Sequence, residues 1–164
     1  MATEMQRNLP VEIIEFEPAH AKRFRDLNYE WLNEYFEVEP FDEIVLSNPE
    51  KQVLAHGGFI FLARVGSEIV GTCALLRHTE NRYELAKMAV TREYRGQGIG
   101  RRLAEAAIQK MREMKVGSLV LATSKLLKPA NMLYESLGFR YVPMAEIGPI
   151  PYKRHTVAME LLLS

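Results

Sequence analysis

The sequence predicts an α/β fold built around one mixed β-sheet. Segments rich in β-branched and aromatic residues, typical of strands, are interspersed with segments whose apolar residues recur every three or four positions, typical of helices. Three strand segments follow one another, at residues 59–65, 69–78 and 83–90, and a glycine-rich turn then leads into a helix. This order of strands and helices favours a sheet with both antiparallel and parallel pairs.

The length and composition indicate a single domain. The chain has 164 residues, 48% of them apolar, so it can bury a core and is too apolar to be disordered. The sequence contains no repeat, low-complexity tract or linker. We therefore expect one domain over residues 1–164.

The first fifty residues predict a short strand followed by helices. Residues 11–16 form the strand, and Pro18 opens a helix at a position where proline is tolerated. One face of this helix should be buried, because its apolar residues recur at spacings of three and four. These residues are Phe24, Leu27, Trp31, Leu32 and Tyr35. Pro40 ends or bends the helix, and a second short helix is expected at 42–47.

The middle of the chain predicts a hairpin, a third strand and a long helix. Gly66 and Ser67 separate the strands at 59–65 and 69–78, which is a hairpin signal. The third strand is expected at 83–90. The helix is expected at 101–115, where one stripe is apolar and the opposite face is charged.

The last fifty residues alternate between strand and helix. A strand is expected at 118–123, a helix at 129–137 and another strand at 139–142. A loop with one glycine and two prolines follows at 145–151, and the final strand is expected at 155–163. The predicted order is therefore strand, helices, three strands, helix, strand, helix and two strands.

The segment Arg95–Gly100, with the sequence Arg-Gly-Gln-Gly-Ile-Gly, joins the end of a strand to the start of a helix. Glycines tolerate positive φ and let a ligand approach the backbone closely. The first N–H groups of a helix have no internal partner, and the helix dipole favours negative charge there. These features predict a site for phosphate or pyrophosphate, with a helix start that binds no ligand as the alternative.

Two nucleotide-binding motifs fit this segment poorly. A dinucleotide-binding fingerprint spaces its glycines as G-x-G-x-x-G, whereas this chain has G-x-G-x-G. A Walker loop requires Gly-Lys-Ser or Gly-Lys-Thr, and neither follows these glycines. Both observations count against a nucleotide-binding enzyme that uses the loop in another way.

Residues 26–50 are acidic and aromatic. They contain eight Asp and Glu residues and no Lys or Arg, with Trp31, Tyr35, Phe36 and Phe41 interleaved. Such a patch would suit a cationic acceptor, because carboxylates pair with ammonium groups and aromatic faces attract them. A solvated acidic face over an aromatic core is the alternative.

Charge and targeting signals exclude several classes of partner. Lys plus Arg equals Asp plus Glu, at 21 each, so nucleic acid is not expected as the main partner. No signal peptide and no apolar run of about 18 residues is present, so no membrane span is expected. Cys73 is the sole cysteine and lies in an apolar strand, which predicts a buried thiol rather than a nucleophile, in a cytoplasmic protein.

Three motifs, in order along the chain, carry a resemblance to a known family. The strand Met88-Ala89-Val90 is followed by the loop Arg-x-x-Gly-x-Gly, residues 95–100. Residues 134–139 read Tyr-Glu-Ser-Leu-Gly-Phe, a helix-to-strand turn, and Val70-Gly71 lies on the earlier strand. Together with the order of elements over residues 11–163, they resemble the GNAT N-acetyltransferase superfamily. Trp31, Tyr35-Phe36, Gly57-Gly58 and residues 84–90 are similar to a GNAT branch sometimes fused to MarR-type regulators.

The resemblance implies a GNAT fold, with a central mixed sheet of about seven strands and about four helices, and acetyl-CoA as co-substrate without a metal. The sheet would open after the fourth strand, and the backbone there would pair with pantetheine as an added strand does. The implied cofactor-binding residues are Met88, Ala89, Val90, Arg95, Gly96, Gln97, Gly98, Ile99, Gly100, Arg101 and Asn131. Many family members place an asparagine where this chain has Ser124 or Leu127, so Ser124 or Asn131 would have to replace it.

The resemblance also implies an acid and a base for attack of an amine on the thioester. Tyr134 matches the position of the acid that protonates the departing thiolate, with a purely packing tyrosine as the alternative. Glu84 is the candidate base, directly or through a water, with an exposed glutamate as the alternative. His56 and His78 are further candidates for the base.

The sequence thus leaves three hypotheses. The first is an N-acetyltransferase that acts on a primary amine of a small molecule or peptide, and the second is a non-catalytic acyl-CoA sensor on the same fold. The third is the nucleotide-binding enzyme. A homodimer is a further expectation, because the exposed C-terminal strand could pair between subunits.

Overall fold

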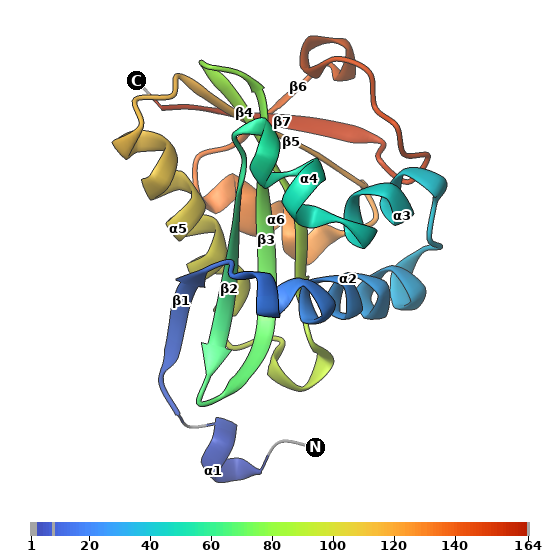
Figure 1. Cartoon of the computed structure of the whole chain (residues 1–164). Coiled ribbons are helices and arrows are strands. Elements are labelled where there is room, and N and C mark those ends of the chain that lie inside the picture. Colours follow the sequence, from blue (N-terminus) through green and yellow to red (C-terminus); the bar gives the residue numbers. More distant parts are fainter. Residues whose placement is uncertain (1–2, 8, 164) are drawn as a thin grey trace.

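The computed structural model describes residues 3–7 and 9–163 (Figure 1). The strands are β1 (Val11–Glu15), β2 (Phe59–Val65), β3 (Glu68–Thr79), β4 (Arg82–Val90), β5 (Ser118–Thr123), β6 (Arg140–Val142) and β7 (Val157–Leu162). The α-helices are α1 (Glu4–Arg7), α2 (Ala21–Tyr35), α3 (Pro40–Ser47), α4 (Pro49–Gln52), α5 (Ile99–Glu113) and α6 (Lys128–Ser136). Short 3-10 helices are η1 (Pro18–His20), η2 (Leu54–His56), η3 (Arg92–Tyr94) and η4 (Met144–Ile147).

The strands form one seven-stranded sheet in the order β1-β2-β3-β4-β5-β7-β6. The β4–β5 pair is parallel, and the other neighbouring pairs are antiparallel. The predicted mixed α/β fold is therefore confirmed. The predicted helices correspond to α2, α3, α5 and α6, whereas the short α1 and α4 were not predicted.

Two predictions about the C-terminal half need correction. The long helix begins at Ile99, two residues before the predicted start, because Gly98 with a φ of 82° already serves as its N-cap. The C-terminal strand β7 is not at an edge of the sheet, because it pairs with β5 on one side and β6 on the other. The proposed route to a homodimer through an exposed C-terminal strand is therefore wrong.

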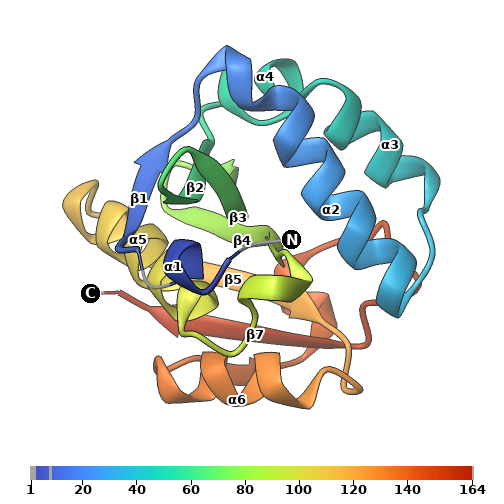
Figure 2. The same cartoon turned by 90° about the horizontal axis from the view of Figure 1, so that it is seen from below.

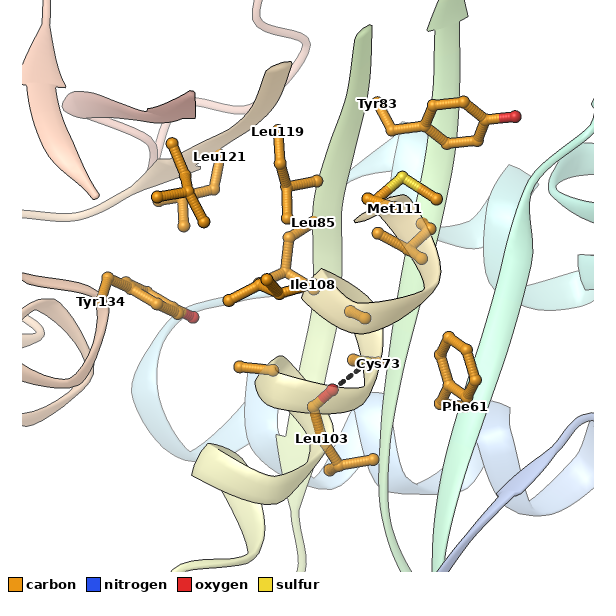
Figure 3. Close-up of a cluster of buried hydrophobic side chains, with 14 of the residues drawn as sticks. Phe61, Cys73, Tyr83, Leu85, Leu103, Ile108, Met111, Leu119, Leu121 and Tyr134 are labelled. Atoms are coloured by element: carbon orange, nitrogen blue, oxygen red, sulfur yellow. Dashed lines mark hydrogen bonds between the residues drawn. The ribbon is translucent and has the colours of Figure 1, made fainter. Parts of the chain in front are cut away.

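Helices cover both faces of the sheet (Figure 2). α2 and α3 pack on one face, where Phe24, Leu27 and Leu46 are buried against β2 and β3. α5 packs on the other face, where its apolar stripe meets Cys73, Leu85 and Leu119 (Figure 3). A Cβ on Gly71 would lie 3.2 Å from the side chains of Ile99 and Leu103, so this glycine lets α5 approach β3 closely.

The sheet opens between β4 and β5. The two strands pair through residues 82–84 and 118–120, and the remaining residues of β5 pair with β7 alone. The β3–β4 register shifts between Thr72 and Ala74, opposite Lys87, whose φ of 55° is rare for a residue with a side chain. This bulge bends β4 away from β5, as the resemblance implied.

Candidate active site

A cleft of about 350 Å³ lies where β4 and β5 separate. Residues 84–88 of β4 and 121–123 of β5 line it. The rest of the lining comes from the end of β3, from α2 and Phe36, the start of α3, residues 124–134 leading into and along α6, and the segment 149–155. The cleft therefore gathers side chains that lie far apart in the sequence.

The glycine-rich loop leaves the start of α5 open. Gly96 and Gly98 have φ values of 76° and 82°, and no atom lies within 4 Å of where a Cβ would stand at either residue. Arg102 donates the first helical hydrogen bond, to the Gly98 carbonyl at 3.1 Å, so the amides of residues 99–101 have no acceptor within the helix. With the dipole of a 15-residue helix behind it, this end suits an anion.

The two arginines next to the loop make contacts within the protein. Arg95 Nε donates to the Val90 carbonyl at 2.8 Å, and Arg95 Nη1 lies 2.6 Å from a Glu34 carboxylate oxygen. Arg101 Nη2 donates to Ser136 Oγ at 2.6 Å. Arg95 therefore fastens the loop to α2 and β4, and the predicted contacts of both arginines with a cofactor stay predictions.

Tyr134 extends from α6 toward α5 and the core, and it also lines the cleft (Figure 3). Its ring packs edge-on against Phe139, with centroids 5.9 Å apart, and the side chain is buried. Burial raises the pKa of Tyr134 to about 12, so its phenol keeps its proton at neutral pH. Both the packing role and the acid role that the sequence left open are compatible with this position.

Glu84 and His78 meet at the cleft. His78 Nε2 lies 2.8 Å from Glu84 Oε1, and both side chains line the cleft. The pairing joins two of the residues that the sequence offered as alternative bases. The third, His56, lies in η2 and is not among the residues that line the cleft.

Both polar atoms of the Asn131 side chain form hydrogen bonds within the protein. Its Oδ1 accepts from Thr123 Oγ1 at 3.1 Å, and its Nδ2 donates to the Ser124 carbonyl at 3.0 Å. The side chain is buried and ties α6 to the end of β5. Its predicted contact with a cofactor therefore gains no support from its side-chain bonds.

A buried ion cluster, which the sequence did not predict, forms part of the cleft wall. Asp42 is fully buried and accepts from Lys87 Nζ at 2.9 Å and from both terminal nitrogens of Arg154, at 2.7 and 2.8 Å. Lys87 Nζ also donates to the Tyr152 hydroxyl at 2.8 Å. The cluster connects the start of α3, the bulge in β4 and the segment before β7.

The contacts within the cluster shift the pKa values of the side chains in this part of the cleft wall. Burial raises the pKa of Asp42, but Arg154 and Lys87 outweigh it and bring the value down to about 2. Burial lowers the pKa of Lys87, against the attraction of Asp42. Burial, aided by the charges of Arg154 and Lys87, lowers the pKa of His155 to about 4. His155 is therefore neutral at pH 7.

The acidic stretch 26–50 is largely paired within the protein. Asp42 and Glu39 are bonded to Arg154, and Glu34 is paired with Arg92 and Arg95. Glu30 accepts from the Thr91 hydroxyl at 3.0 Å. Three of the eight carboxylates that the sequence offered for a cationic acceptor, Glu34, Glu39 and Asp42, are thus neutralised by cations of the protein. The cations that pair with these carboxylates lie at residues 87–95 and 154, outside the acidic stretch. The composition of residues 26–50 alone could therefore not indicate the pairing.

The sequence is similar to a family of known proteins and to curated relatives within it. Residues 23–139 match the family described as "Acetyltransferase (GNAT) family". N-acetylaspartate synthetase from Xenopus tropicalis is 32% identical over 106 residues, which cover 64% of this chain and 39% of that protein. N-alpha-acetyltransferase 30 from Xenopus laevis is 43% identical over 83 residues, which cover 48% of this chain and 30% of that protein. The chain thus spans less than half the length of either relative.

Solved structures show the same fold. An acetyltransferase from Streptococcus agalactiae superposes with a TM-score of 0.82 at 26% identity, covering 93% of this chain and 98% of that one. A structure from Salmonella typhimurium, which holds its cofactor acetyl-CoA, superposes with a TM-score of 0.73 at 18% identity, covering 94% and 95%. In the part of the chain that the structure describes, no helix is long and apolar enough to cross a membrane. The chain belongs to the acetyltransferase (GNAT) family.

Proposed function

We propose that this protein is an N-acetyltransferase that moves the acetyl group of acetyl-CoA to a primary amine by direct attack in a ternary complex. One observation carries the proposal: a helix start suited to an anion follows the end of β4, and a cleft lined by Tyr134 and Glu84 lies where β4 separates from β5. Membership of the acetyltransferase family supports the choice of reaction.

The coenzyme would lie along the opening between β4 and β5. Its pyrophosphate would accept hydrogen bonds from amides of residues 96–101, where the two left-handed glycines leave room. Pantetheine would run beside Met88–Val90, which has no β5 partner on that side. The Val90 carbonyl already accepts from Arg95, so Met88 is the better candidate for a main-chain contact.

In the reaction, the amine nitrogen forms a bond to the acetyl carbon and the carbon–sulfur bond breaks. Glu84, hydrogen-bonded to His78, would take the amine proton directly or through a water. A backbone N–H of the bulged strand would polarise the thioester carbonyl. Tyr134, whose phenol keeps its proton to high pH, would protonate the departing thiolate. Tyr134 thus begins the cycle with the proton that its step requires.

The names of the relatives concern acetylation at nitrogen, and one specifies N-acetylaspartate as a product. They do not decide the acceptor, because the chain matches only part of each protein. We therefore propose a primary amine, of a small molecule or a peptide, as the acceptor class. The assignment to the branch fused to MarR-type regulators and the cytoplasmic location also stay proposals. A homodimer is a further proposal, and it would need a surface other than β7, which is paired on both sides.

An acceptor screen tests the proposed function. The protein is mixed with acetyl-CoA and each member of a panel of primary amines, and free coenzyme A is detected by a thiol reagent. We expect thiol release that depends on one class of amine. Tight binding of acetyl-CoA in calorimetry with no release for any amine would instead favour the non-catalytic sensor.

A thermal-shift comparison distinguishes the transferase hypothesis from the nucleotide-binding hypothesis. Ligands that bind the folded state raise the melting temperature, and the rise grows with the logarithm of the ligand concentration divided by its dissociation constant. We expect a shift with acetyl-CoA and none with NAD or ATP. A larger shift with NAD or ATP would favour the nucleotide-binding enzyme.

A further inference from the structure

Two walls of the cleft are joined to each other by contacts between the start of α3 and the segment 149–155. Arg154 forms a bidentate pair with Asp42 and a further ion pair with Glu39 at 3.3 Å. The Lys153 amide donates to a Glu39 carboxylate oxygen at 3.0 Å. The rings of Phe41 and Tyr152 meet edge to face, with centroids 5.7 Å apart. We call this set of contacts the bridge.

The charged centre of the bridge is buried and costly to open. Asp42 is 0% exposed as a side chain, and Lys87 and Arg154 are only 6% and 7% exposed. Opening the walls would pull Arg154 from Asp42 and leave buried charges without partners, which is strongly unfavourable. The stacking of the Arg154 guanidinium 4.2 Å from the Tyr152 ring centroid adds to the closure. Figure 1 shows the start of α3 beside the segment that leads into β7.

We propose that the acceptor is a small free amine and that the amino terminus of a polypeptide is excluded. This inference rests on the proposed transferase function. The bridge residues Phe41, Asp42, Tyr152 and Arg154 all line the cleft that holds Glu84, so the bridge closes the wall next to the candidate base.

The size of the cleft leads to the same conclusion. Its volume of about 350 Å³ is near the lower limit for ligand sites, roughly 300–1,000 Å³. The thioester end of the coenzyme must share this space with the acceptor. A peptide whose first amine reached Glu84 would need an exit for its later residues, each of which extends the chain by about 3.3–3.6 Å. The bridge joins α3 to the segment 149–155 and so closes this side of the cleft to such a chain.

The test compares matched acceptors of increasing length. Each L-amino acid amide is assayed with acetyl-CoA beside the same residue extended by two glycines, together with a set of alkylamines. We expect kcat/KM to fall by about 100-fold or more on extension, as for a site that rejects a substrate by shape. A peptide that reacts within about threefold of its parent amide would overturn the inference and leave the transferase function intact.

Two variants test whether the bridge causes the discrimination. Arg154→Gln removes its central cation, and Glu39→Gln is a milder change that keeps the Asp42 pair in case the first variant fails to fold. Arg140→Gln, on exposed β6, is the matched control. We expect the penalty for extended acceptors to shrink at least about tenfold in a bridge variant and to stay unchanged in the control.

Two results would contradict the inference in different ways. An unchanged penalty in both folded bridge variants would overturn the role of the bridge. No acetylation of any amine, with acetyl-CoA bound in calorimetry, would overturn the transferase function and the acceptor inference with it.

Discussion

The Nε2 atom of His78 lies 2.8 Å from Oε1 of Glu84, at the point where β4 leaves β5. The pair brings a residue near the end of β3 to the strand that would face the thioester. The contact orients the Glu84 carboxylate, which is 18% exposed, and gives a proton accepted there a second partner.

Glu84→Gln should lower kcat because an amide cannot accept the proton of the amine. We expect a loss of about 10²–10⁴-fold, the usual contribution of a general base. His78→Gln should cost less, because Glu84 stays in place. Steady-state kinetics with a saturating amine would check both, and a Glu84→Gln enzyme with full kcat would remove this residue from the mechanism.

Tyr134→Phe should lower kcat while leaving acetyl-CoA affinity unchanged, because only the phenolic proton is lost from a packed ring. We expect a fall of about 10²-fold, measured by thiol release together with calorimetry. Leu133→Ala, a truncation next to it on α6, controls for disturbed packing. Unchanged turnover in Tyr134→Phe would assign the residue a packing role alone.

The pH dependence of Tyr134 gives a separate test. Burial raises its pKa to about 12, so the phenol should stay protonated through pH 10, where an ordinary tyrosine is half ionised. The absorbance of tyrosinate is titrated in the wild type and in Tyr134→Phe. The two curves should coincide up to about pH 11, and a difference near pH 10 would show an ordinary phenol.

Asp42 should make the free energy of unfolding depend on pH in the acidic range. Its pKa is about 2 in the folded protein against an ordinary value of 3.8, so it stabilises the fold above pH 4 and loses this contribution as the pH falls toward 2. The shift corresponds to about 2 kcal/mol. Urea unfolding of wild type and Asp42→Asn at pH 7 and pH 3 would measure it.

At pH 7, Asp42→Asn should lose about 3–5 kcal/mol of unfolding free energy, because Lys87 and Arg154 remain buried without their counter-charge. Asp26→Asn is the control, since Asp26 pairs with Lys22 at the surface of α2. Equal stabilities of the two variants at pH 7 would contradict the role of the cluster.

Local patterns were enough to predict the elements and the glycine-rich loop. Gly96 and Gly98, the glycines by which the loop was identified in the sequence, have positive φ values in the structure. The strands begin and end within two residues of their expected bounds. Cys73 is buried, as its apolar strand predicted, and burial raises the pKa of its thiol to about 12. These features depend on neighbours in sequence, so periodicity and composition could reveal them.

The rest depends on contacts between distant segments. Asp42 meets Arg154 across 112 residues, and no spacing rule connects them. The place of β7 between β5 and β6 is likewise a matter of tertiary pairing, which the order of elements does not determine. Glu84 and His78 are close in sequence, but their contact depends on the register between β3 and β4, so they were predicted as alternatives rather than as a pair.

The glycine-rich loop gives a direct prediction for binding. Gly98→Glu should abolish acetyl-CoA binding, because it forces a side chain into a left-handed position at φ 82° and sets a negative charge where the pyrophosphate would lie. Gln109→Glu is the control, since it adds the same charge at an exposed position of α5 far from the start of the helix. Calorimetry should show binding in the control, and normal binding in Gly98→Glu would contradict the loop assignment.

A crystal structure of the protein soaked with acetyl-CoA would test the central claim most directly. We predict the diphosphate within hydrogen-bonding distance of the amides of residues 98–101 and the thioester in the cleft beside Met88. A coenzyme bound elsewhere, or a cleft filled by protein side chains, would contradict the account.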